Sequence, residues 1–304
     1  MQTQSRRLED DMALDPTVQL DPNRCICVIG PQISAEYLSS AERARTPAVL
    51  SYRRLVESGI QRVLEMEPFE SSEERLRRQT LLVNAYELEP AFASIKVVET
   101  LKARGCYEQW LAEVFSSLRN TPAQRGTNAI IDHLLRLQDK GMLLAYSHYD
   151  TVLDTAMGCE PILLDSEDAV RKWAARRTSG LLHIHGAHTH PASMKWDCIA
   201  YESAVGESGG SRVLKDLCRN RTVLFVGFDG EYFDPFLPKF ASCFISSANV
   251  PARCPLLIAA GSKTPVHPSF VTLRLPQLVS LEKLLQPSLT PRHGEVEPCQ
   301  SNQN

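Results

Sequence analysis

The chain has 304 residues, of which 43% are apolar and 23% are charged, and its 33 basic and 36 acidic side chains give a formal net charge of −3. A chain of this length and composition can fold around a core of ordinary size. Its nearly balanced charge gives no broad attraction for a phosphate backbone or an anionic membrane. We therefore expect neither nucleic acid nor a membrane as a partner.

The N-terminal segment MQTQSRRLEDDMALDP has no apolar core of the kind that a secretory signal needs. No stretch reaches the roughly 18 consecutive apolar residues of a membrane span, so we expect a soluble, intracellular protein of the cytoplasm or nucleus. The nine cysteines include no Cys-x-x-Cys pair. This pattern favours reduced thiols over disulfides and argues against a four-cysteine zinc module.

Both ends of the chain are predicted to be disordered tails. Residues 1–22 are polar and carry two prolines, and residues 287–304 have almost no large apolar side chains. Such segments cannot bury enough apolar surface to offset the entropy of ordering the chain. One folded domain is therefore expected over residues 23–286.

Six short apolar runs bounded by turn residues are predicted to be strands. In chain order they are 24–30, 142–146, 181–185, 222–227, 255–260 and 271–275. They are apolar almost throughout, which is typical of parallel strands that are buried on both faces.

Helical periodicity fills the intervals between these runs. Three or four helices are predicted over roughly 50–138, an unusually long insertion that could form a small subdomain or lid. Ser71 and Glu74 have the spacing of a capping box, and segment 165–177 places acids first and bases last, as a helix dipole favours. The alternation predicts an α/β fold, a Rossmann-like doubly wound parallel sheet with a helical insertion.

The first segment of chemical interest follows the first predicted strand, which ends at Gly30, four residues before Ser34. In dinucleotide-binding folds such a turn brings backbone N–H groups against a pyrophosphate. A tight strand-to-helix turn with one glycine is also a common structural feature. This segment alone leaves both interpretations open.

The second segment is the polar sequence after residues 142–146, where Ser147, His148, Tyr149 and Asp150 follow one another. They lie at the carboxyl end of a predicted strand, which is the ligand-binding side of an open α/β sheet. Asp150 can accept a hydrogen bond from an amide ligand there. The alternative is a cap for the next helical turn.

The third segment contains four histidines, and a strand period of two predicts that His183 and His185 share one face. His185 precedes Gly186 at a strand end, a position suited to acid–base chemistry near neutral pH, although a core histidine is the alternative. A His-x-His spacing also permits a metal site. No carboxylate or cysteine cluster stands nearby in the sequence, so we predict no metal.

The fourth segment follows residues 222–227, where Gly227 ends the strand and Asp229 and Asp234 come next. A glycine at this point allows a ligand to approach the backbone closely. A simple glycine-rich turn explains the same residues.

These four segments, in this order, resemble the sirtuin-like domain, whose pattern is Gly-x-Gly-x-Ser, Thr-x-Asn-x-Asp, His-Gly and Phe-x-Gly-x-x-x-x-Asp. The resemblance covers about residues 24–286. It is closest to the zinc-free branch named "family with sequence similarity 118", through VIGPQISA, WLAEVFSSL, DSEDAVRKWA, LLHIHGAHTHP and LFVG, with Tyr201 downstream. It implies a fold that holds NAD across the strand tips and cleaves the bond between nicotinamide and ribose.

The resemblance also implies roles for single residues. His185 would be the general base or the partner of a ribose hydroxyl, Asp150 would meet the carboxamide, and Gly227 would face the adenine-side ribose. The implied catalytic residues are His185, His148 and Asp150. The implied NAD-binding residues are Gly30, Gln32, Ser34, Ser147, Asp150, Gly186, Gly227, Asp229 and Asp234. NAD or ADP-ribose would be the ligand, without zinc, and the family is associated with filament-like self-assembly, so a homo-oligomer is expected.

Two residues depart from the family pattern. Gln32 replaces the second glycine and follows Pro31, so one backbone donor is missing and a Cβ intrudes where phosphates should approach. His148 replaces an asparagine that offers a donor and an acceptor together. Two functions therefore stay open, an NAD hydrolase and a self-assembling module that binds NAD or ADP-ribose without turnover. A protein deacylase or a metal hydrolase fits less well.

Overall fold

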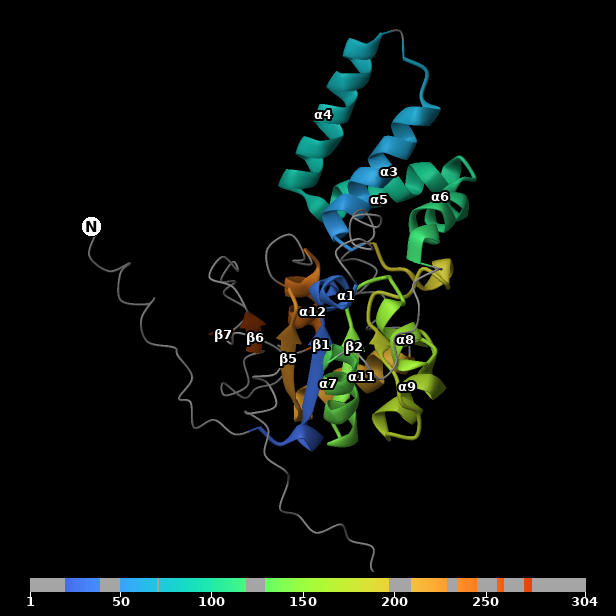
Figure 1. Cartoon of the computed structure of the whole chain (residues 1–304). Coiled ribbons are helices and arrows are strands. Elements are labelled where there is room, and N and C mark those ends of the chain that lie inside the picture. Colours follow the sequence, from blue (N-terminus) through green and yellow to red (C-terminus); the bar gives the residue numbers. More distant parts are fainter. Residues whose placement is uncertain are drawn as a thin grey trace, which may run out of the picture.

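The computed structural model describes residues 20–38, 50–69, 71–118, 129–196, 209–228, 235–244, 256–259 and 271–274. At its centre is a seven-stranded sheet in the order β3-β4-β2-β1-β5-β6-β7. All neighbouring strands in it are parallel. The predicted α/β fold with a parallel sheet is therefore confirmed (Figure 1).

The strands are β1 (Cys25–Ile29), β2 (Leu143–Tyr146), β3 (Ile162–Leu163), β4 (Leu182–His183), β5 (Thr222–Val226), β6 (Leu256–Ala259) and β7 (Val271–Arg274). Each of the six predicted runs contains one of them. Strand β3 is missing from the prediction because the apolar run around it, residues 162–164, is shorter than the four to eight residues that indicate a strand. Strand β1 lies between β2 and β5. The chain therefore builds one side of the sheet first, from β2 to β4, and then crosses to the other side of β1 to form β5 to β7.

Apolar cores cover both faces of the sheet. Successive side chains of a strand point to opposite faces, so Ile26 and Val28 join one core, and Cys27 and Ile29 join the other. Helices α3 (Tyr52–Met66), α5 (Pro90–Ala103), α6 (Tyr107–Val114), α9 (Glu167–Ala174), α11 (Gly209–Asn220) and α12 (Leu237–Phe244) contribute to the first core. Helices α1 (Pro31–Tyr37), α7 (Ala129–Asp139) and α8 (Val152–Met157) contribute to the second.

Within the predicted helical insertion, the described residues form five α-helices rather than three or four. They are α3, α4 (Ser72–Leu88), α5, α6 and α7, with the short 3₁₀ helix η2 (Phe115–Leu118) after α6. Figure 1 shows α3 to α6 beyond the carboxyl ends of the strands, whereas α7 runs beside the sheet. The insertion above the sheet is therefore α3 to α6, and α7 belongs to the layer that covers one face.

Local sequence signals explain where two of these helices begin. The hydroxyl of Ser71 accepts the N–H of Glu74 at 3.1 Å, as the capping-box spacing predicts. Helix α9 begins after Ser166, whose side chain caps the N–H of Ala169. Because both caps satisfy N–H groups that a first turn leaves unpaired, the two helix starts are set by their own sequences.

The predicted N-terminal tail ends earlier than expected. The 3₁₀ helix η1 (Pro22–Arg24) begins inside it, Asp21 accepts the N–H of Asn23 at 2.9 Å, and Leu20 packs against the second core. Residues 1–19 and 287–304 lie outside the described residues. Among the residues described, no helix is long and apolar enough to span a membrane, and the six cysteines are free.

Candidate functional site

The carboxyl ends of β1, β2 and β5 meet at one edge of the sheet. The N–H of Ser147, just after β2, donates to the carbonyl of Ile29 at 3.0 Å, and the N–H of Gly30 donates to the carbonyl of Val226 at 2.7 Å. Strands β2 to β4 extend the sheet on one side of β1, and strands β5 to β7 extend it on the other side. The carboxyl end of β1 is therefore a topological switch point. Open α/β sheets bind their ligands at such a point.

Three of the predicted site glycines are required by packing. A Cβ on Gly30 would lie 2.2 Å from the carbonyl oxygen of Gly227, and one on Gly186 would lie 2.2 Å from that of Ser193. Gly227 has a φ of +82°, and its Cβ would meet Ile33 at 2.6 Å. The structural alternative therefore accounts for these glycines without any ligand.

The start of α1 uses its own backbone donors. The N–H of Gln32 donates to the carbonyl of Gly227, and the N–H of Ile33 donates to that of Gly30, both at 3.2 Å. The Gln32 side chain is turned to solvent, where its amide donates to Glu36 at 2.9 Å. Phosphates that approach this turn would therefore have to compete with bonds that the protein already makes.

Asp150 is the centre of a buried hydrogen-bond network. Its Oδ1 accepts the Ser34 hydroxyl at 3.1 Å and the N–H of Val152 at 3.0 Å, and its Oδ2 accepts the Tyr146 hydroxyl at 2.5 Å and His148 Nδ1 at 2.8 Å. The Ser34 and Tyr146 hydroxyls also lie 2.6 Å apart. The bond to Val152 pairs the first N–H of α8, but the N-cap residue of this helix is Thr151 rather than Asp150. The structure thus brings together the predicted site residues Ser34, His148 and Asp150.

Sequence reasoning missed Tyr146 as a member of this network. The available signal is its position, the first of the Thr-x-Asn-x-Asp pattern, four residues before Asp150. The side chain is fully buried. Burial, the charge of Asp150 and its hydrogen bond to Asp150 raise the pKa of Tyr146 well above its usual value. Tyr146 thus remains a donor to the carboxylate at any pH near neutrality.

The carboxylate of Asp150 requires a proton on Nδ1 of His148. Burial alone raises the pKa of Asp150, but the hydrogen bond and charge of His148, with the Tyr146 and Val152 donors, outweigh it and hold that pKa below its usual value. An ionised carboxylate only accepts hydrogen bonds, so Nδ1 of His148 must donate. The N–H of Asp150 lies 3.4 Å from the same nitrogen, too far to compete with the contact of 2.8 Å.

When His148 is neutral, its lone pair consequently lies on Nε2. That atom is buried and has no hydrogen-bond partner among the described residues, and the same holds for the hydroxyl of Ser147. Buried polar atoms are nearly always paired, so two unpaired ones at a strand edge call for an explanation. A ligand at this edge would supply one.

A second carboxylate–imidazole pair lies beside the first. His183 Nε2 is 2.9 Å from Asp154 Oδ2, both side chains are buried, and the His183 ring packs edge-on against Tyr146 with centroids 5.4 Å apart. Burial lowers the pKa of His183, but the charge of Asp154 and its hydrogen bond outweigh this and raise it. Asp154 Oδ1 has no partner among the described residues.

Sequence reasoning missed the single carboxylate that accompanies His183. The sequence hides the pair because Asp154 and His183 are 29 residues apart and meet only through α8 and β4. Each carboxylate forms a hydrogen bond with a single histidine, Asp150 with His148 and Asp154 with His183. Across the described residues, no group of three or more His, Cys, Asp or Glu side chains is arranged to hold a metal ion.

His185 is fully buried, but it does not share the surroundings of His183. Strand β4 ends at His183, so the alternation used in the prediction does not reach residue 185. The His185 ring contacts Tyr149 at 6.2 Å and Phe236 at 6.4 Å between centroids. Tyr149 is also 5.7 Å from the His148 ring, so it contacts the rings of both His148 and His185.

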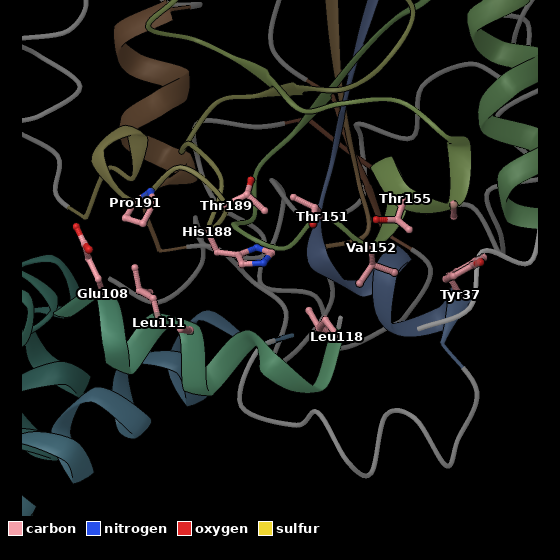
Figure 2. A pocket seen from close by; sticks show the side chains of 12 residues that line it. Tyr37, Glu108, Leu111, Leu118, Thr151, Val152, Thr155, His188, Thr189 and Pro191 are labelled. Atoms are coloured by element: carbon pink, nitrogen blue, oxygen red, sulfur yellow. The ribbon is translucent and has the colours of Figure 1, made fainter. Parts of the chain in front are cut away.

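A cavity of about 450 Å³ lies next to this edge of the sheet. Figure 2 shows it between α6 with η2 on one side and α8 with the loop after β4 on the other. Its lining includes Tyr37, Leu111, Leu118, Thr151, Val152 and His188. Thr151 and Val152 directly follow Asp150. The sequence did not predict the cavity because its walls come from segments far apart in the chain.

His188 stands in the wall of this cavity (Figure 2). Its ring stacks on Phe115 of η2, with centroids 4.2 Å apart and an interplanar angle of 8°. Its Nδ1 lies 3.0 Å from the carbonyl oxygen of Tyr149. Through these two contacts His188 joins η2 of the insertion to the carboxyl edge of the sheet at the wall of the cavity.

Taken together, the fold and the site define an α/β protein with two buried carboxylate–imidazole pairs at the carboxyl edge of a parallel sheet. No protein-family model matches the chain. Similarity to sirtuin-like domains therefore stays a prediction from the motifs. The predicted site residues Asp229 and Asp234, and Tyr201, lie outside the described residues.

Proposed function

We propose that this chain binds NAD at the carboxyl edge of a Rossmann-like, doubly wound sheet and hydrolyses the bond between nicotinamide and ribose. The observation that carries the proposal is the His148–Asp150 pair. Asp150 holds the imidazole through Nδ1 and leaves the basic Nε2 without a partner among the described residues. This is how a carboxylate prepares a histidine to act as a general base.

The proposed reaction uses one water molecule. The water oxygen bonds to the anomeric carbon of the ribose, the carbon–nitrogen bond breaks, and its electron pair leaves with nicotinamide. The proton of the attacking water passes to His148 Nε2. Asp150 then stabilises the imidazolium through the contact of 2.8 Å, as a buried carboxylate does when its histidine gains charge. The products are nicotinamide and ADP-ribose.

NAD is proposed as the ligand because of the sequence resemblance, and the volume of the cavity is compatible with a ligand of this kind. A cavity of about 450 Å³ lies in the range of small-molecule sites, and it adjoins Asp150 through Thr151. The His148 side chain is only 1% exposed, so neighbouring side chains must shift before a ligand can touch Nε2. In this proposal the resemblance assigns His185 to a ribose hydroxyl, and the phosphates bind away from the start of α1.

The test is nicotinamide release from NAD by the purified chain, followed by chromatography. His148→Asn should lower the rate by roughly 100-fold or more, as loss of a general base does. His190→Asn is the matched control, because His190 is exposed and lies outside the network. Because the family carries asparagine at this position, a faster His148→Asn variant would show that the site needs an amide. That outcome would overturn the role of His148.

The second histidine is tested in the same assay. His185→Ala should also lower nicotinamide release if His185 meets a ribose hydroxyl, with the larger loss in kcat. A rate that is unchanged by both His148→Asn and His185→Ala would place the chemistry elsewhere. The melting temperature of each variant must be measured in parallel, because both side chains are buried.

A second function, binding of NAD or ADP-ribose without turnover, has a specific observation in its favour. Asp150 already accepts four hydrogen bonds, and the first N–H groups of α1 are bonded internally. The melting temperature should then rise with NAD by mass action while NAD stays intact. Absence of any shift with NAD and with ADP-ribose would argue against both functions.

A further inference from the structure

Three arginines come together at the amino ends of the strands, at the opposite end of the sheet from Asp150. Arg24 directly precedes β1 and Arg221 directly precedes β5, and these two parallel strands are neighbours in the sheet. The third, Arg176, lies just after the end of α9. Figure 1 shows this end of the sheet on the far side from helices α3 to α6. Basic side chains from three distant segments of the chain therefore meet here.

Two of these arginines share one acceptor. The guanidinium groups of Arg176 and Arg221 both donate to the carbonyl oxygen of Asn23, from Arg176 at 3.1 Å, and Arg176 also donates to the carbonyl of Gly141 at 2.6 Å. A carbonyl oxygen accepts hydrogen bonds but carries no net charge, and each guanidinium has five N–H donors. Among the described residues, none of the three arginines has a carboxylate within ion-pairing distance. Their positive charge is therefore not neutralised by ion pairs.

The arginines also affect one another through their charge. Burial, and after it the charge of Arg176, lower the pKa of Arg221 below its usual value, and Arg24 adds to this, although Cys25 and Asp21 act in the opposite direction. Arg221 is partly buried, whereas Arg24 and Arg176 are exposed. Like charges that are held close together disfavour the charged forms. An anion bound among the three side chains would remove this repulsion.

The backbone of Arg176 has an unusual conformation. Its φ is +57°, and among the described residues it is the only one besides glycines with a positive φ. Arg176 stands at the position where glycine usually ends a helix, because its N–H donates to the carbonyl of Trp173 and the N–H of Arg177 donates to that of Lys172. A side chain disfavours the left-handed conformation there. Strained residues of this kind gather at functional sites, which indicates a role for the guanidinium of Arg176.

A cavity of about 200 Å³ is lined by Arg176 and Trp173. The Trp173 side chain is only 1% exposed, and its Nε1 has no hydrogen-bond partner among the described residues. An indole N–H can only donate, so the missing partner is an acceptor. The other lining residues are mostly polar and include one carboxylate, that of the exposed Asp139: Gln138, Asp139, Met142, Leu143, Thr178 and Ser179.

We infer that this end of the sheet binds the phosphate ester of a small sugar. The phosphate lies among Arg24, Arg176 and Arg221, because planar guanidinium groups match its oxygens. The sugar occupies the cavity, where Trp173 Nε1 donates to one of its oxygens. The inference goes beyond the proposed function and does not depend on it.

The cavity decides the class of ligand. Its volume of about 200 Å³ is below the roughly 300 Å³ at which ordinary small-molecule pockets begin, so the bound group must be small. The hydroxyls of Thr178 and Ser179, the amide of Gln138 and the carboxylate of Asp139 are groups that can pair with sugar hydroxyls. An apolar ligand would leave these groups and Trp173 Nε1 without partners.

The experiment is isothermal titration calorimetry of the full chain at constant ionic strength, with ribose 5-phosphate, inorganic phosphate and ribose as probes. Ribose 5-phosphate should bind with a Kd below about 1 mM and at least about 10-fold more tightly than inorganic phosphate, because only the ester also fills the cavity. Ribose alone should not bind measurably. Equal affinities for the ester and for inorganic phosphate would indicate an adventitious ion only. That outcome, or no binding of the ester, would overturn the inference.

Arg176→Gly is the most informative variant, because glycine favours the left-handed backbone at this position and so preserves the end of α9 while the guanidinium is lost. Binding of ribose 5-phosphate should weaken by about 10-fold or more, as loss of charge-assisted hydrogen bonds does. Arg221→Gln should have a similar effect, and its amide can still donate to the Asn23 carbonyl. Trp173→Phe should weaken binding by about 5-fold, because it removes one donor.

Arg177→Gln is the matched control, since it removes the same charge from an exposed side chain one residue further along the chain. It should bind ribose 5-phosphate as tightly as the wild type does. Circular dichroism checks that each variant is folded. Equal weakening in Arg176→Gly and Arg177→Gln would show only a diffuse attraction for anions. That outcome would overturn the inference, as would binding that is unchanged in both Arg176→Gly and Arg221→Gln.

Discussion

The strand edge and the exposed side of helix α4 reverse the usual distribution of side chains in opposite ways. At the strand edge, His148, Asp150 and His183 are buried, whereas on α4 the leucines Leu81 and Leu88 are in solvent. Proteins normally bury the apolar side chains and expose the charged ones. The stability of the core therefore explains neither the buried charged and polar residues nor the exposed leucines.

The two regions differ in how strongly the rest of the fold depends on them. Asp150 accepts four hydrogen bonds from neighbours on three segments of the chain, so its loss leaves several buried donors unpaired. Leu88 is 81% exposed, so its loss removes almost no packing. Substitution of Asp150 should consequently destabilise this protein more than substitution of Leu88, and the following predictions measure that contrast.

The largest effect is expected for Asp150→Ala. It removes a buried carboxylate from Ser34, Tyr146 and His148, and breaking a buried charged network costs about 3–5 kcal/mol of unfolding free energy. Urea unfolding measures this loss. Asp168→Ala is the control, since Asp168 forms an exposed pair with Lys172, and it should cost less than about 0.5 kcal/mol. Equal losses for the two variants would contradict the network.

Gly30→Ala should come next. Its Cβ would lie 2.2 Å from the carbonyl oxygen of Gly227, so β1 and β5 would have to separate, at a cost of about 3 kcal/mol. Gly105→Ala is the control because a Cβ there meets nothing within 4 Å. Its φ of +66° leaves only the penalty of about 1 kcal/mol for a left-handed residue. Urea unfolding in which Gly105→Ala is the worse variant would rule out the contact.

A smaller effect is expected from pH. The pKa of His183 is raised in the folded protein, so its contribution to stability is complete below the unfolded pKa of about 6.5 and is lost as pH rises through the folded pKa. His183→Asn should therefore destabilise the protein most at acidic pH. Unfolding free energies at several pH values above 5 would measure this, and a difference that does not vary with pH would refute it.

Asp150 should have the opposite dependence. Its pKa is lowered in the folded protein, so its contribution is present above the unfolded pKa of about 3.9 and is lost as pH falls through the folded pKa. The wild type should lose stability below pH 4 more steeply than Asp150→Asn, which has no carboxylate at this position. Acid unfolding curves that coincide for the two proteins would contradict the lowered pKa.

The smallest effect is expected for Leu88→Gln. Since Leu88 has little contact with the rest of its own chain, the unfolding free energy should change by less than about 0.5 kcal/mol. The measurement belongs at low protein concentration, about 1 µM, so that association does not contribute. A loss above about 2 kcal/mol would mean that Leu88 is packed within the monomer, and the contrast with the strand edge would fail.

Much of the fold could be predicted because strands and caps depend on local sequence. Six apolar runs predicted six of the seven strands, and Ser71 marked the start of α4. The prediction failed where the signal was too short, as in β3, or where it depended on where a strand ends. His183 and His185 were placed on one face, but β4 ends at His183 and the two rings have different neighbours.

The class of the fold and the polar residues at the strand ends follow from local sequence, because period and turn chemistry act between near neighbours. The partners of those residues follow from the tertiary structure. It paired His183 with Asp154 across 29 residues, gave the Asp150 carboxylate to His148, Tyr146 and Ser34, and left Leu88 in solvent. Such contacts depend on strand order, register and helix packing, which bring together residues that no local pattern connects.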